Sequence, residues 1–196
     1  MRLAIWLIPG LSALALAACA TEGGADDDMA VVADGDPGPP TAVSTIGPPR
    51  LTAELRDAQG QVRARATAET SGDSLRVRVE AVGMSAGAYG AHLHTTGRCD
   101  PPGFETAGPH WNPTGQMHGK DNPKGMHKGD LPNLTVGTDG RGSFEYTIPN
   151  AGLSGMLPTA LIDGDGAAVV IHALPDDFRT DPSGKSGARI ACGVLG

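Results

Sequence analysis

The strongest constraint on the fold is a period-two alternation of apolar and charged side chains. Residues Leu75–Glu80 read Leu-Arg-Val-Arg-Val-Glu, a pattern that gives a strand one buried face and one wet face. No stretch of comparable length has a sustained helical period. Other short strand candidates, separated by turn-forming residues, lie at 51–56, 62–70, 89–95, 134–137, 144–148, 167–174 and 188–194. Many short strands with turns between them predict an all-β antiparallel sandwich or barrel.

Residues 96–131 interrupt this pattern. They are 36 residues rich in Gly, Pro, Asn, His and Lys, without strand alternation. Loops of that length are uncommon in compact domains and are usually functional. A metal ion and a disulfide could organise such a segment where a hydrophobic core could not.

The N-terminus has the features of a secretory signal. A basic start is followed by an apolar run, Leu3–Leu16, and by small residues before Cys19. The run is short for a membrane span, and a buried helix, the alternative, finds no obvious partner downstream. The tetrapeptide Leu16-Ala17-Ala18-Cys19 resembles the bacterial lipobox, in which the cysteine is lipidated and becomes the new N-terminus. We therefore expect a lipoprotein signal peptide at 1–18 and lipidation of Cys19.

Residues 19–47 are predicted to be a disordered acidic tether, and residues 48–196 the folded domain. The tether is rich in Gly and Pro and has few bulky apolar side chains to bury. It carries six acids: Glu22, Asp26, Asp27, Asp28, Asp34 and Asp36. When these and Arg2 are removed, the net charge of -7 becomes -2 for residues 48–196. A near-neutral domain without a basic run argues against nucleic-acid binding.

Three cysteines are an awkward number for an exported protein. Lipidation of Cys19 would leave Cys99 and Cys192 as one available pair, and an oxidising compartment favours their joining. The bridge would close a loop of about 90 residues, stabilising by at most roughly 4–5 kcal/mol in the chain-entropy model. Two free buried thiols are the alternative.

All six histidines fall in or beside the long loop and the strands near it. His92 and His94 are two residues apart in a strand, so their side chains share one face. His110, His118 and His127 lie in the loop with Asp130, and a set of imidazoles with one carboxylate suits zinc. Their concentration predicts a metal site.

Four segments resemble the Cu/Zn superoxide dismutases, here of the bacterial exported lipoprotein type. They are Gly90–His94, Gly108–Pro113, His118–Leu131 and Gly187–Val194. The intervals of eight, nine and three residues from His110 to Asp130 fit the family pattern. The resemblance implies an immunoglobulin-like Greek-key β-sandwich or barrel, with a long metal-binding loop and a second long loop near the C-terminus.

The same resemblance implies a role for each site residue. Copper would take His92, His94, His110 and His172, and zinc would take His110, His118, His127 and Asp130. His110 would bridge the metals as an imidazolate. Alternate reduction and reoxidation of copper would convert two superoxide anions to oxygen and hydrogen peroxide. Arg189 would dock the anion, with a surface ion pair as the alternative. Asp176 would link His92 and His118, with a solvated turn acid as the alternative.

The expected setting is the bacterial periplasm, with a lipid anchor at Cys19 holding the protein to a membrane. Monomer and homodimer both stay open. Lys120, Lys124 and Lys128 are candidates for steering the substrate. A metal carrier without enzymatic activity is the main rival function, and an adhesive or structural sandwich is the second. The second rival leaves the histidine cluster without a purpose.

Overall fold

The computed structural model describes residues 49–155 and 158–196. The expected signal peptide, Cys19 and the tether lie outside the described residues. Within the described part, no helix is long and apolar enough to cross a membrane.

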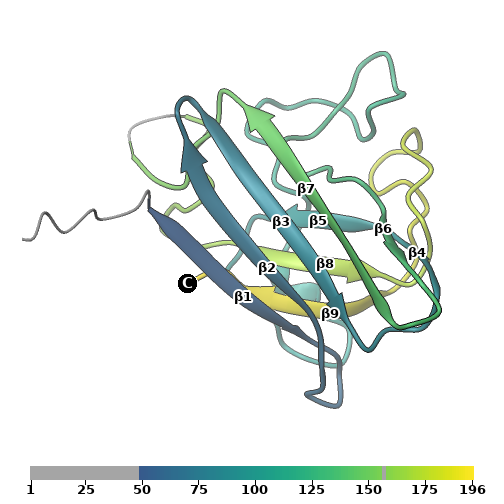
Figure 1. The fold of residues 1–196 in the computed structure, drawn as a ribbon. Coiled ribbons are helices and arrows are strands. Elements are labelled where there is room, and N and C mark those ends of the chain that lie inside the picture. The colour runs from purple at the N-terminus through teal and green to yellow at the C-terminus, as the bar shows by residue number, and fades with distance from the viewer. Residues whose placement is uncertain (1–48, 156–157) are drawn as a thin grey trace, which may run out of the picture. The chain divides into compact units, whose positions relative to one another are not determined.

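Seven antiparallel strands form one sheet in the order β5-β8-β9-β1-β2-β3-β7, and β4 and β6 form a second, two-stranded sheet. Figure 1 shows β1, β2, β3 and β7 side by side, with β5, β8 and β9 crossing them as a second layer. The strands are β1 Arg50–Arg56, β2 Val62–Ser71, β3 Ser74–Val82, β4 Gly87–Tyr89, β5 Ala91–His94, β6 Leu134–Val136, β7 Arg141–Pro149, β8 Ala168–His172 and β9 Arg189–Val194. The all-β antiparallel prediction is confirmed, and the Greek-key connectivity stays a prediction.

The core lies between the two layers, as the alternation predicts. In β3, Leu75, Val77 and Val79 are fully buried, while Arg78 and Glu80 are exposed on the opposite face. The buried side chains of β1–β3 form one apolar cluster with those of β5, β8 and β9. This burial of one face of each strand is the main source of stability for such a sheet.

Strands β5 and β8 differ because both of their faces are buried. Ala91 and Leu93 point into the core. His92 and His94 point to the opposite face, where Phe104 and Ala107 of the long loop pack against Ala168 and Val170 of β8. Isolated backbone bridges from His92 to Asp130 and from His94 to His110 pair the loop with the edge of β5. The loop thus takes the place that solvent has on the other strands.

One strand prediction is wrong: residues 89–95 form no single strand. The chain breaks at Gly90 into β4 and β5, which belong to different sheets. Gly90 donates its N–H to the Leu174 carbonyl at 2.8 Å, and a Cβ there would lie 2.8 Å from the Cβ of Ser186. The break therefore comes from segments distant in sequence that pack against a residue without a side chain.

The long loop contains no strand, as expected, and its only helical turn in the described residues is the 3-10 helix η1, Glu105–Ala107. Its organisation comes from a disulfide, from buried polar side chains and from apolar anchors, since Trp111 and Leu131 join the core and Phe104 is buried in a smaller apolar cluster.

Candidate metal centre

Four histidines from three parts of the chain converge on the outer face of β5 and β8. His92 and His94 come from β5, His172 from the end of β8, and His110 from the loop. One ring nitrogen of each lies within 4.8 Å of the others. The buried nitrogens His92 Nδ1, His94 Nε2, His110 Nε2 and His172 Nε2 have no hydrogen-bond partner within the protein. Unpartnered buried nitrogens are costly, and their convergence fits a metal ion.

The second nitrogen of three of these rings is held by the protein. His94 Nδ1 donates to the Gly108 carbonyl at 2.8 Å, and His172 Nδ1 to the Gly187 carbonyl at 3.1 Å. His92 Nε2 donates to Asp176 Oδ2 at 2.8 Å. A ring that donates through one nitrogen presents the lone pair of the other, which is the form a metal needs.

A second group surrounds Asp130. Its Oδ1 lies 3.1 Å from His110 Nδ1, 3.0 Å from His118 Nδ1 and 3.1 Å from His127 Nδ1. Its Oδ2 accepts the backbone N–H groups of Gly119 and His127. Because the backbone satisfies Oδ2, Oδ1 is left as the oxygen that faces the three imidazoles. Three nitrogens and one carboxylate oxygen match a closed zinc site.

The membership of this second group has one ambiguity. The set whose ligand atoms are all mutually close contains His92, His110, His118 and Asp130, without His127. His92 has one unpartnered nitrogen, Nδ1, which the first group uses, because Nε2 is bound to Asp176. His127 Nδ1, by contrast, lies 3.1 Å from Asp130 Oδ1. The hydrogen bonding therefore favours His127 as the fourth ligand.

Asp176 connects the two groups. It is buried, so the interpretation as a solvated turn acid is wrong. Oδ2 accepts from His92, and Oδ1 accepts from His118 Nε2 at 3.0 Å. Asn133 holds the backbone of Asp176 on both sides, since its Nδ2 donates to the Asp176 carbonyl and its Oδ1 accepts the Asp176 N–H. One carboxylate thus orients a ring from each group.

Burial sets the protonation of the first group. It lowers the pKa of His92 to about 3 and of His172 to about 4, and it also lowers the pKa of His94 and His110. These rings are neutral at neutral pH, as ligation requires. In the second group, hydrogen bonding outweighs burial in setting the pKa of Asp130. Burial would raise the pKa of Asp130, but hydrogen bonds with His110, His118 and His127 outweigh it and hold the pKa far below its ordinary value.

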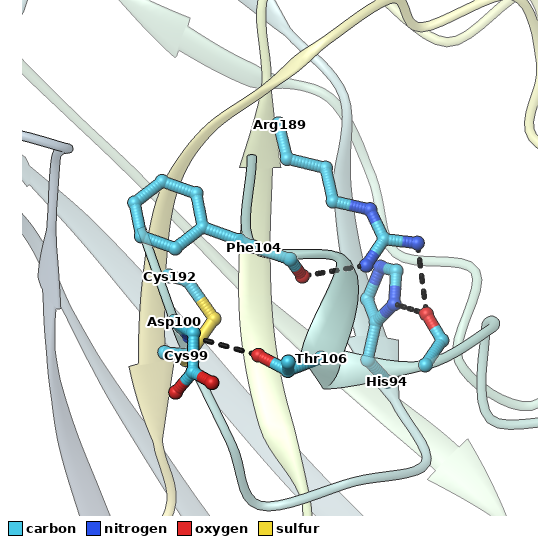
Figure 2. Close-up of a disulfide and its surroundings, with 8 residues drawn as sticks. His94, Cys99, Asp100, Phe104, Thr106, Arg189 and Cys192 are labelled. Atoms are coloured by element: carbon cyan, nitrogen blue, oxygen red, sulfur yellow. Dashed lines mark hydrogen bonds between the residues drawn. A yellow bond between two sulfur atoms is a disulfide. The ribbon is translucent and has the colours of Figure 1, made fainter. Parts of the chain in front are cut away.

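Arg189 reaches the same face of the sheet through a β-bulge. The register shifts between Ile171 and His172, so that Arg189, rather than Ile190, stands opposite His172. Its Nη1 donates to the Phe104 carbonyl and its Nη2 to the Gly108 carbonyl, both at 2.8 Å. The Gly108 carbonyl also accepts from His94 Nδ1, and Figure 2 shows His94 beside Arg189. The guanidinium and a candidate copper ligand are therefore held by one backbone group.

The disulfide Cys99–Cys192 joins the loop to β9, so the alternative of two free thiols is wrong. Figure 2 shows it beside the segment that carries Phe104. Because this segment supplies both carbonyls that hold Arg189, the bridge fixes the base of the arginine's binding site.

An open cleft of about 760 Å³ lies above this face, lined by His110, His127, His172 and Arg189 among others. A small anion in the cleft can therefore meet both the arginine and the histidines.

The three lysines proposed to steer substrate do not line the cleft. Lys120 lies 4.5 Å from the centre of the Phe178 ring and pairs with Asp121. Lys128 donates to the Pro149 carbonyl at 2.6 Å. Their contribution to steering stays a prediction, without support from the lining of the cleft.

The structure brings together the ligand candidates that the sequence predicted, and it adds supporting groups that the sequence did not predict. The carbonyls of Phe104 and Gly108 carry no residue-type signal, because any residue has a carbonyl. Asn133 was open to detection, since it lies three residues after Asp130 and just beyond the loop that was expected to be functional. Asp181, which accepts the His118 N–H at 2.7 Å, stands among other acids and offered no such signal.

The fold and site together define a β-sheet protein with two adjacent sets of metal ligands under an anion-accessible cleft. The sequence model of the copper/zinc superoxide dismutase (SODC) family matches residues 58–195. A superoxide dismutase-like protein of Bacillus subtilis is 42% identical over 128 residues, 65% of each chain. A Cu-Zn superoxide dismutase of Deinococcus radiodurans is 37% identical over 79% of this chain and 88% of its own. The crystal structure of a double mutant of a SOD-like protein from Bacillus subtilis has a TM-score of 0.70 at 40% identity, covering 74% of this chain and 95% of that one.

The chain belongs to the copper/zinc superoxide dismutase family. Its two histidine-rich groups support copper and zinc as its metals, and the predictions of family, enzyme class and cofactors are confirmed.

Proposed function

We propose that this protein converts superoxide to oxygen and hydrogen peroxide in the cleft above His110 and His172. The observation that carries the proposal is the convergence of four buried, unpartnered nitrogens, from His92, His94, His110 and His172, beneath an arginine-lined opening. These four residues are the proposed copper ligands. Copper would supply the one-electron chemistry, since imidazole suits it and zinc has no redox chemistry.

The proposed zinc ligands are His110, His118, His127 and Asp130. Their role is to fix the long loop and the ring of His110. His110 belongs to both groups, with Nδ1 toward Asp130 and Nε2 toward the first group. Neutral imidazole has one free lone pair, so serving both metals requires loss of the second ring proton. His110 lines the cleft, and its Nε2 is the atom that we propose takes up a proton and passes it to peroxide.

Arg189 is proposed to dock the anion. Guanidinium has five N–H donors, always carries its charge, and presents a planar fork. Two donors are used on the Phe104 and Gly108 carbonyls, which leaves others for a diatomic anion at the cleft. The two carbonyls hold the side chain in place, and with 18% of its surface exposed it is still reachable from solvent.

The test is superoxide dismutation by protein loaded with copper and zinc, with both metals quantified. Activity that requires copper, and that falls in His172→Ala, is the expected result. Full metal loading with no dismutation would overturn the enzymatic role and favour a metal carrier.

We also propose that the enzyme protects the bacterial cell envelope from superoxide, as a periplasmic domain, residues 48–196, anchored through lipid on Cys19. The support is the signal-like run Leu3–Leu16 before a lipobox-like Cys19. Expression of the full chain in bacteria should place it in the membrane fraction, and Cys19→Ser should release soluble protein. Continued membrane attachment of Cys19→Ser would contradict lipidation.

A further inference from the structure

The cleft has an unusual balance of charge for a site that receives an anion. Among the described residues that line it, Arg189 is the only arginine or lysine, and Glu105 and Asp163 are both acidic. The side chains that line the cleft therefore carry at least as much fixed negative charge as Arg189 carries positive charge, before the two metal ions are counted.

Glu105 is the acid that meets Arg189. Its Oε2 lies 3.8 Å from Arg189 Nε, and its side chain is 83% exposed. That separation is longer than a hydrogen bond. The Phe104 and Gly108 carbonyls already orient the guanidinium through Nη1 and Nη2. Glu105 is therefore not needed to hold Arg189 in place, and what it adds is negative charge.

We propose that Glu105 is a specificity-determining residue that weakens anion binding at Arg189, more strongly for doubly charged anions than for singly charged ones. The inference rests on the proposed function, because it assigns Arg189 as the anion-docking group. Coulomb energy is proportional to the charge of the bound anion. A carboxylate that repels superoxide to some extent therefore repels hydrogen phosphate about twice as strongly in free energy. The site would accept its monoanion while abundant dianions are kept out.

The size of the effect follows from the exposure of Glu105. Exposed ion pairs change equilibria by about two- to fivefold. We expect Glu105→Gln to tighten binding of a monoanion by about twofold and of a dianion by about fourfold. Removal of the repulsion should also make the dismutation rate fall more steeply with added salt, since salt screens a stronger net attraction.

The experiment uses copper- and zinc-loaded protein and two anions. Azide binding is measured by absorbance titration, and phosphate binding at pH 8 by displacement of azide. Glu105→Gln should tighten azide binding by about twofold and phosphate binding by about fourfold. Glu105→Asp keeps the charge and should leave the salt dependence of the dismutation rate near that of the wild type. In an Arg189→Ala background, where both anions bind more weakly, Glu105→Gln should still tighten phosphate more than azide, because the carboxylate acts on the charge of the anion itself.

Glu145→Gln is the matched control. Glu145 lies on β7, and it pairs with Arg76 at 3.7 Å with half of its side chain exposed. The substitution changes net charge equally outside the cleft and should leave both affinities unaltered. An equal response of Glu145→Gln would show a general charge effect and overturn the proposal.

Other results of these titrations would overturn either the role of Glu105 or the proposed function. Unchanged or weaker anion binding in Glu105→Gln, or equal tightening of azide and phosphate, would overturn the role of Glu105 while the wild type stays an active dismutase. Loaded wild type that binds both anions without dismutating superoxide would instead overturn the proposed function.

Discussion

Loss of the disulfide Cys99–Cys192 should strongly destabilise the metal-free protein. The bridge spans 93 residues of sequence and ties the long loop to β9. In the chain-entropy model a closed loop of this size stabilises by about 4–5 kcal/mol. For a domain of about 150 residues each kcal/mol shifts Tm by about 2–4 °C. The double variant Cys99→Ser/Cys192→Ser should therefore melt about 10–20 °C below the oxidised protein.

The assays are thermal melting, which gives Tm, and guanidinium unfolding, which gives the free energy, of the metal-free protein, both followed by the fluorescence of Trp111, which is buried in the core. Comparison of oxidised, reduced and double-serine forms separates loss of the bridge from the effect of the serines. A loss below about 1 kcal/mol would refute the argument that the bridge organises the loop. A second readout is the dismutation rate at equal metal content. The dismutation rate should fall when the disulfide is removed, because the segment that holds Arg189 is then no longer tied to β9.

Three further predictions concern the site. Asp176→Ala removes the acceptor of His92 and His118, so affinity for both metals should fall by about 10–100-fold, as measured by chelator competition; unchanged affinities would contradict the orienting role. Arg189→Ala should lower kcat/KM for superoxide with both metals still bound, and full activity in stoichiometrically loaded protein would remove its docking role. Metal-free protein should lose stability on acidification from pH 6.5 to 4.5, because burial lowers the pKa of His92 to about 3 and of His172 to about 4. In that window the unfolded chain binds protons that the folded chain excludes, which costs about 2 kcal/mol for each ring; a flat denaturant midpoint across it would contradict their burial as neutral groups.

The sheet was largely predictable because its signal is local. In β3, the apolar residues Val77 and Val79 are buried, and the charged residues beside them are partly or fully exposed to solvent, as the alternation alone predicts. The break at Gly90 was not predictable in this way. It depends on Leu174 and Ser186, more than 80 residues away in sequence, and no pattern around Gly90 reports them.

In the candidate site, too, the residues with a local sequence signal were predictable and the others were not. The ligand candidates are rare residue types at informative spacings, and their convergence follows from the strand face of His92 and His94 and from the resemblance. The charge of the cleft was beyond sequence reasoning. Lysines in the long loop were expected to supply it, yet Lys120 and Lys128 have partners elsewhere. Glu105, with no motif to mark it, is the residue that meets Arg189.

The central claim is that two metals share His110, and anomalous diffraction at the copper and zinc edges tests it most directly. Crystals of the loaded protein should place copper among His92 Nδ1 and the Nε2 atoms of His94, His110 and His172. Zinc should lie among the Nδ1 atoms of His110, His118 and His127 and Oδ1 of Asp130. One ion only, or zinc bound by His92 in place of His127, would contradict the account.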